Sequence, residues 1–162
     1  MNGENAADGR GITAKIAERL LASGADVVTL GNWAWGQKGF APYLSGTDRV
    51  LRPANMSPVS PGRGLAVHDG VAVISLLGEL TLKPYESPFL AADRLVAEAR
   101  RETPVVLVDF HAEATSEGSA RRCEIETTID GAPEGWMSMR DPYARPFSTT
   151  SSRPTTVPST GE

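Results

Sequence analysis

Four side chains in three short stretches of this sequence have the chemistry to bind a metal ion or a phosphate. They are Glu4 and Asn5 in NGEN, Asn32 in GN and His111 in DFHAE. A carboxylate, two amide oxygens and an imidazole suit manganese, iron or zinc better than calcium, which prefers a shell of oxygen ligands. One carboxylate and one histidine are few ligands for a catalytic metal centre, so these residue types alone leave other roles open.

Structural roles are the alternative for each of these residues. Asparagines such as Asn5 and Asn32 commonly cap helices or form turns. Glu4 would then be a solvated charge, and His111 would be a hydrogen-bonded histidine after a strand. The second histidine of the chain, His68, lies in a predicted hairpin turn and is assigned to no site.

The stretches lie where predicted strands end, which would bring them together in space. Residues 27–30 form a short apolar run that ends at Gly31-Asn32, and residues 105–110 form a second run that ends at His111. In open α/β sheets, ligands bind beyond the carboxyl ends of the strands. We therefore predict two buried strands whose ends place the four side chains in one site.

The apolar periodicity before the first strand predicts a helix. Ile12, Ile16 and Leu20 recur on one helical face. Thr13 is suited to be the N-cap of this helix, and Gly24 is suited to end it. A helix, a tight turn and a buried strand together form one α/β unit.

Three more elements are predicted between the two strands. Residues 49–64 contain three prolines and should form an irregular loop. Residues 65–77 read as a β-hairpin with its turn at residues 68–70. Ser87 followed by Pro88 predicts the N-cap and the first position of a second amphipathic helix.

Composition and charge are those of an ordinary globular protein. The chain has 162 residues, of which 40% are hydrophobic and 22% are charged, and this suffices for one domain. The net charge of −4 argues against a nucleic-acid polymer as the partner, because such proteins need a basic face. The sequence shows neither an apolar run of about 18 residues nor a signal pattern. We therefore expect a cytoplasmic protein with no membrane contact.

The periodic pattern ends near Glu117. Residues 118–162 hold 5 of the 12 prolines and many serines and threonines, without an apolar period. This composition is typical of a disordered tail. The single cysteine, Cys123, lies in this segment and cannot form an internal disulfide. We predict one domain over residues 1–117 and a tail over residues 118–162.

Five motifs in order resemble a bacterial family of calcineurin-like metallophosphoesterases, the 2′,3′-cyclic-nucleotide 2′-phosphodiesterases. The first two motifs are NGENAADGRGIT and SGADVVTLGN, the second of which is followed by Trp35. The third is RVLRPAN followed by PGRG, the fourth is made of the letters PF, AD and L within PFLAADRL, and the fifth is VDFHAEATSE. Together they cover residues 2–117. The resemblance implies an α/β sandwich of two mixed sheets flanked by helices. It implies two divalent metal ions, iron or manganese, and a small phosphorylated nucleotide as the substrate. The metal ligands that it implies are Glu4, Asn5, Asn32 and His111.

The sequence departs from this family in the loop after Asn32. The family loop typically reads Gly-Asn-His-Thr-Trp-Asp, whereas this chain reads Gly-Asn-Trp-Ala-Trp-Gly. Trp33 occupies the position of the histidine that would protonate the leaving oxygen. An indole N–H cannot serve as a general acid near neutral pH, and its bulk would crowd the phosphate. Gly36 replaces the aspartate of the same family loop. With both polar residues of the loop replaced, we assign no catalytic residue.

Two further family motifs have no counterpart here. One is a first strand that ends in Gly-Asp, and the other is a Gly-Thr-His-Thr-His motif that supplies two histidine ligands. We expect an incomplete, degenerate member of the family that lacks the first strand and the C-terminal part. We expect this chain to be inactive as written. We also expect that both of its ends result from the reading frame. The alternatives are an active phosphodiesterase and a binding module without catalysis. A homo-oligomer is left open.

Overall fold

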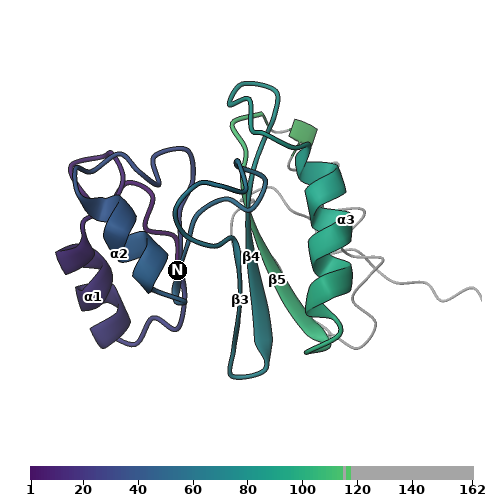
Figure 1. Cartoon of the computed structure of the whole chain (residues 1–162), viewed down its shortest axis with the longest axis horizontal. Coiled ribbons are helices and arrows are strands. Elements are labelled where there is room, and N and C mark those ends of the chain that lie inside the picture. Colours follow the sequence, from purple (N-terminus) through teal and green to yellow (C-terminus); the bar gives the residue numbers. More distant parts are fainter. Residues whose placement is uncertain (115, 118–162) are drawn as a thin grey trace, which may run out of the picture. The chain divides into compact units, whose positions relative to one another are not determined.

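The computed structural model describes residues 1–114, 116 and 117, which belong to the first of two compact units, Met1–Ala132. The predicted tail and Cys123 lie outside the described residues. Helices and strands are mixed along the chain, so the predicted α/β class is confirmed (Figure 1). The elements are α1 (Ala14–Ala22), β1 (Val28–Thr29), α2 (Phe40–Gly46), β2 (Val50–Leu51), β3 (Leu65–His68), β4 (Val71–Leu77), α3 (Pro88–Ala99) and β5 (Val105–His111).

A parallel sheet of two buried strands forms the first part of the fold. The backbone N–H groups of Val28 and Leu30 donate to the carbonyl oxygens of Arg49 and Leu51, both at 2.8 Å. The first predicted strand is thus confirmed as β1. The irregular loop predicted for residues 49–64 is wrong at β2, because this apolar pair precedes the first proline of the segment and lies beside β1.

Helix α1 begins where the sequence indicated. The Thr13 hydroxyl accepts a hydrogen bond from the Ile16 backbone N–H at 3.3 Å, which is the N-cap arrangement. The helix ends before Gly24, whose φ of +97° lies in the left-handed region that favours glycine. The predicted cap and stop of this helix are both confirmed.

Helices α1 and α2 pack on the first sheet through one apolar cluster. Figure 1 shows the two helices side by side in the N-terminal part of the fold. Ala17 of α1, Phe40 and Leu44 of α2, and Val28 and Leu30 around β1 are buried together. Helix α2 was not predicted, since its seven residues are too few to show a clear period.

The second sheet is mixed and has the strand order β3-β4-β5. Strand β3 is antiparallel to β4, and β5 is parallel to it. The connecting turn uses Asp69 and Gly70, with φ values of 47° and 77°, as a two-residue hairpin turn requires. The predicted hairpin is confirmed, but His68 pairs with Val71 and therefore belongs to β3 and not to the turn.

Helix α3 covers one face of the second sheet, as Figure 1 shows. Its Ala91, Ala92 and Leu95 pack against Ile74 and Leu76 of β4. The start predicted at a serine and a proline is confirmed, with the proline in the first turn of the helix. Ser87 is the N-cap residue as predicted, although its side chain makes no capping hydrogen bond.

Strand β5 is present as predicted, but it is not buried throughout. Val106 and Val108 pack against the cluster that α3 covers. Val105 and Leu107 point to the other face and are 44% and 47% exposed. The prediction that this strand is buried is therefore wrong for these two residues. Within the described residues, the first half of β5 is covered on one face only.

The two sheets meet through a small apolar cluster of Val27, Leu51 and Val73. The Ser75 hydroxyl donates to the Leu30 carbonyl oxygen at 2.9 Å and links the two sheets further. Helices thus lie outside two facing sheets, which agrees with the expected sandwich. No helix in the part of the chain that the structure describes combines the length and the apolar character needed to cross a membrane.

Candidate functional site

The Glu4 carboxylate lies at the end of β1 and is held by backbone N–H groups. Its Oε1 accepts a hydrogen bond from the Trp33 N–H at 2.6 Å, and its Oε2 accepts one from the Gly31 N–H. Only 2% of the residue is exposed. The interpretation of Glu4 as a solvated charge is therefore wrong, since a buried carboxylate needs such partners.

His111 reaches the same place from the second sheet. A Cβ atom built on Gly31 would lie 2.8 Å from His111 Cγ and Nδ1 and 2.9 Å from Glu4 Cδ. The imidazole and the carboxylate are therefore neighbours across the bare backbone of this glycine. This approach depends on glycine, because any side chain would fill the gap between them. The ends of β1 and β5 thus bring together one carboxylate and one imidazole.

The two asparagines are placed differently from each other. Asn32 directly follows Gly31 and is half-buried, whereas Asn5 directly follows Glu4 and is exposed. Neither asparagine is the N-cap of a helix, but both lie in turns, so the structural alternative is wrong as to capping and confirmed as to turns. Among residues 1–114, 116 and 117, neither side chain makes a hydrogen bond. That Glu4, Asn5, Asn32 and His111 bind metal stays a prediction.

Asp109 is a neighbour of the site that was not selected from the sequence. Its Oδ2 accepts hydrogen bonds from Asn2 Nδ2 at 2.8 Å and from the Thr29 hydroxyl. Asp109 and His111 are two positions apart in β5, so their side chains leave the same face of the strand. This period of two was the signal that could have identified Asp109.

Glu117 is a buried carboxylate that lies against the loop after β4. It is 4% exposed, and its Oε1 accepts hydrogen bonds from the backbone N–H groups of Glu79 at 2.7 Å and Leu80 at 3.2 Å. Its Oε2 is buried without a hydrogen bond among the described residues. The hydrogen bonds of Glu117 hold the loop that follows β4, and the Gly78 N–H in this loop donates to the His111 carbonyl oxygen at 2.9 Å.

Trp33 contributes its backbone to the site and turns its indole outward. The residue is 37% exposed, and the Arg10 guanidinium carbon lies 4.1 Å from the centre of its ring. This is a cation–π contact on one face of the indole. Trp35, by contrast, donates its indole N–H to the Pro61 carbonyl oxygen at 3.3 Å, which anchors the proline-rich loop.

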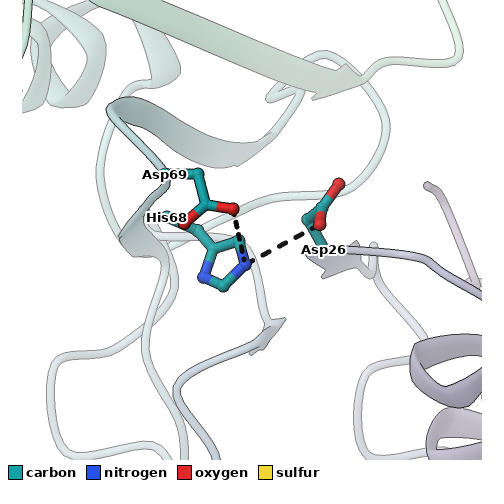
Figure 2. Close-up of side chains that lie close together, drawn as sticks. All are labelled: Asp26, His68 and Asp69. Atoms are coloured by element: carbon teal, nitrogen blue, oxygen red, sulfur yellow. Dashed lines mark ion pairs between the residues drawn. The ribbon is translucent and has the colours of Figure 1, made fainter.

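A second group of possible metal ligands surrounds His68. Figure 2 shows Asp26, His68 and Asp69 close together, with His68 Nε2 3.7 Å from each carboxylate. Their ligand atoms all lie within 4.8 Å of one another, which makes the group a geometric candidate for a metal ion. The aspartate side chains are 74% and 89% exposed, and the Arg49 guanidinium donates to the Asp26 carbonyl oxygen at 2.7 Å. Water and this nearby cation weaken the attraction for a metal.

The two groups of ligands lie at opposite ends of the second sheet. His68 pairs with Val71 at the start of β4, whereas Leu77 at its end pairs with His111. A seven-residue strand separates them by about 20 Å at 3.3 Å per residue. The group around His68 therefore is not part of the site at Gly31.

The chain is similar in sequence and in structure to known proteins. The chain is 46% identical over 121 residues to the 2′,3′-cyclic-nucleotide 2′-phosphodiesterase of Bacillus subtilis, a match that covers 72% of this chain and 46% of that relative. A solved structure of a hypothetical protein from Thermus thermophilus is 39% identical with a TM-score of 0.66, covering 74% of this chain and 48% of that one. A novel phosphatase from Mycoplasma pneumoniae is 28% identical with a TM-score of 0.68, covering 79% and 48%.

The chain thus spans about half the length of the relatives that it matches. The profile of one family, described as YmdB-like protein, matches residues 1–131. This match includes every described residue of the site and of both sheets. The chain therefore belongs to the YmdB-like protein family.

Proposed function

We propose that this chain carries part of a metal-dependent phosphodiesterase site that takes 2′,3′-cyclic nucleotides. The observation that supports the proposal is the buried Glu4 carboxylate beside His111, at the strand ends where α/β folds bind ligands. The name of the Bacillus subtilis relative gives the reaction and the substrate class. The substrate would be a small phosphorylated nucleotide and not a nucleic-acid polymer.

The residues at Gly31 fit a transition-metal ion. Each oxygen of Glu4 accepts one N–H, which leaves a second lone pair on each oxygen for a cation. Within the described residues, His111 makes no side-chain hydrogen bond, so a ring nitrogen is available as a ligand. Glu4, Asn5, Asn32 and His111 would hold iron or manganese, and two such ions are implied by the family. A bound metal would supply Lewis-acid chemistry for the phosphate and for water activation.

The chain's own residues support binding better than turnover. The backbone N–H groups of Gly31 and Trp33 fix the Glu4 carboxylate in one orientation. The indole of Trp33 offers no acidic proton for the leaving oxygen. We therefore propose that the isolated chain binds metal and substrate and hydrolyses the substrate poorly. A cytoplasmic location and a homo-oligomer both stay predictions.

Titration calorimetry with Mn²⁺ tests the metal site. His111→Ala should lower the Mn²⁺ affinity at least about tenfold, the size of effect typical for metal-site residues. His68→Ala is the matched control, because it removes the other histidine at the opposite end of the sheet. If His68→Ala abolishes binding and His111→Ala does not, the metal site lies at the exposed group of Asp26, His68 and Asp69, and the proposal is wrong.

A binding module without catalysis is the second candidate function. It is favoured by the exposed indole of Trp33, which stands at the site with Arg10 on one face of its ring. An aromatic ring of this kind can stack on a nucleobase. Under this function, 2′,3′-cyclic AMP should bind without hydrolysis and quench tryptophan fluorescence. Trp33→Ala should weaken that binding, whereas hydrolysis of the bound nucleotide would favour the enzyme.

A further inference from the structure

The Arg10 side chain lies next to the candidate site and is linked to it through Trp33. Its guanidinium carbon is 4.1 Å from the centre of the Trp33 ring, and both residues are exposed. The backbone N–H of Trp33 donates to Glu4 Oε1 at 2.6 Å. One residue thus touches the buried carboxylate with its backbone and carries a cation on its ring. A positive charge is therefore held at the edge of the site.

The loop that carries Arg10 has a fixed backbone. Three of the four residues 8–11 lie in the left-handed region, with φ values of 52°, 77° and 70°. The Arg10 N–H donates to the Ala7 carbonyl oxygen at 3.0 Å, and the Arg10 carbonyl oxygen accepts from Gln37 Nε2 at 2.6 Å. Because both backbone groups are bonded, the side chain starts from a defined place. A ligand that binds it therefore loses less free energy to ordering of the loop.

The Arg10 side chain reaches the indole across the bare backbone of Gly36. A Cβ atom built on Gly36 would lie 3.4 Å from Arg10 Cγ and 3.5 Å from Trp33 Cβ. A Cβ atom on Gly11 would lie 2.8 Å from the Trp33 carbonyl oxygen. The two loops are thus in close contact, and the glycines at both positions leave room for this approach.

The hydrogen-bond donors of Arg10 are not used within the described residues. There the guanidinium makes neither a hydrogen bond nor an ion pair, although three ion pairs are present elsewhere. A cation–π contact is made with the face of the ring and needs no N–H donor as a hydrogen bond. The planar guanidinium carries five N–H groups in a fork that fits two oxygens of a phosphate. Arg10 can therefore keep its contact with Trp33 and bind an anion at the same time.

We propose that Arg10 and Trp33 form one ligand subsite, in which Arg10 binds a phosphoryl group of a nucleotide and the exposed indole stacks on its base. This inference rests on the proposed function and adds to it the residue that selects a nucleotide over the corresponding nucleoside. Stacking on an aromatic ring tolerates every base, because each base has a π face. The subsite therefore discriminates by the charge of the phosphate and only weakly by the base.

Titration calorimetry with 2′,3′-cyclic AMP and with adenosine, which lacks the phosphate, tests this subsite. The buffer contains EDTA, so neither a metal ion nor hydrolysis contributes. Arg10→Gln should weaken binding of 2′,3′-cyclic AMP at least about tenfold and that of adenosine less than about twofold, since only charge-assisted hydrogen bonds to the phosphate are lost. Arg10→Lys keeps the charge without the planar fork and should give an intermediate loss. Arg19→Gln is the matched control, because it removes an exposed arginine of α1 and the same charge.

Equal affinities of the wild type for the two ligands would overturn the inference. Equal losses for both ligands in Arg10→Gln would also overturn it, because Arg10 would then only hold the indole in place. Binding of neither ligand would sink it together with the nucleotide part of the proposed function.

The Mn²⁺ titration separates this inference from the proposed metal site. Arg10→Gln should bind Mn²⁺ as the wild type does, because Arg10 is not among the expected metal ligands. Intact Mn²⁺ binding without selection for the phosphate means that the inference alone is wrong. Selection for the phosphate by a wild type that binds no Mn²⁺ supports the inference and contradicts the metal site.

Discussion

At the residue scale, Gly31 sets how closely the two sides of the candidate site approach each other. A methyl group there would lie under 3.0 Å from both the His111 ring and the Glu4 carboxyl carbon. Gly31→Ala should therefore lower the free energy of unfolding by about 1–3 kcal/mol, the usual cost of overpacking, and weaken Mn²⁺ binding. Urea unfolding and titration calorimetry measure the two effects.

Gly46→Ala is the control for this substitution. Gly46 is the last residue of α2, and a Cβ atom there would meet nothing within 4 Å. Alanine should be neutral or should stabilise the helix by up to about 1 kcal/mol. Equal effects of the two substitutions would show that the close approach at Gly31 does not constrain the site.

Tyr43 gives the chain a pH dependence at high pH. Burial, followed by the hydrogen bond to Glu18 and its charge, raises the pKa of Tyr43 to about 12, from 10.0. Between these values the unfolded chain has lost the proton that the folded chain keeps, so stability falls as the pH rises from 10 toward 12. Below pH 10.0 the full contribution is present.

Tyr43→Phe should remove this part of the pH dependence. Urea unfolding midpoints at pH 9, 10 and 11 for the two proteins provide the measurement. Between pH 10 and pH 11, the stability of the wild type should fall more steeply than that of Tyr43→Phe. Parallel curves would mean that the hydroxyl of Tyr43 titrates alike in the folded and unfolded chains.

At the scale of the element, the two long helices begin in different ways. Thr13 caps α1 with a hydrogen bond, whereas the Ser87 side chain makes no such bond at the start of α3. Thr13→Ala should cost about 1 kcal/mol of stability, and Ser87→Ala should cost clearly less. Urea unfolding of both variants checks this difference. A larger loss for Ser87→Ala would contradict the capping seen in the structure.

The elements that could be predicted from the sequence are those fixed by local chemistry. Helix α1 shows a 3.6-residue period and has a cap at Thr13, and the Asp69-Gly70 pair sets the hairpin. Strand β2 has only two residues and exists because β1 lies beside it, so no local pattern marks it. The exposure of Leu107 could not be predicted either, because it depends on what lies across from β5.

The candidate site, like the fold, could be predicted from the sequence only in part. The resemblance to metallophosphoesterases pointed to Glu4 and His111, and the structure places these two residues together at Gly31. The hydrogen bonds from the Gly31 and Trp33 N–H groups to Glu4 depend on the path of the loop after β1. Since side-chain identity does not encode that path, the sequence could not show how the carboxylate is held.

At the scale of the whole molecule, the chain corresponds to about half of an intact relative. The match to the Bacillus subtilis phosphodiesterase covers 46% of that protein. A two-metal centre works when both ions and the reacting groups are in place together. Restoring a single catalytic group should therefore raise the turnover of this chain only a little. Substitution of Trp33 tests this expectation.

Trp33→His returns the family's histidine to the loop after Asn32. A general acid ordinarily contributes about 10²–10⁴ in rate, but only to a substrate that the rest of the site already activates. We expect Trp33→His to stay at least about 100-fold slower than the intact relative with Mn²⁺ and 2′,3′-cyclic AMP. Trp33→Phe, assayed beside it, separates the removal of the indole from the addition of an acid. Turnover by Trp33→His within about tenfold of the relative would show that these residues form a complete catalytic site and that the tryptophan alone had silenced it.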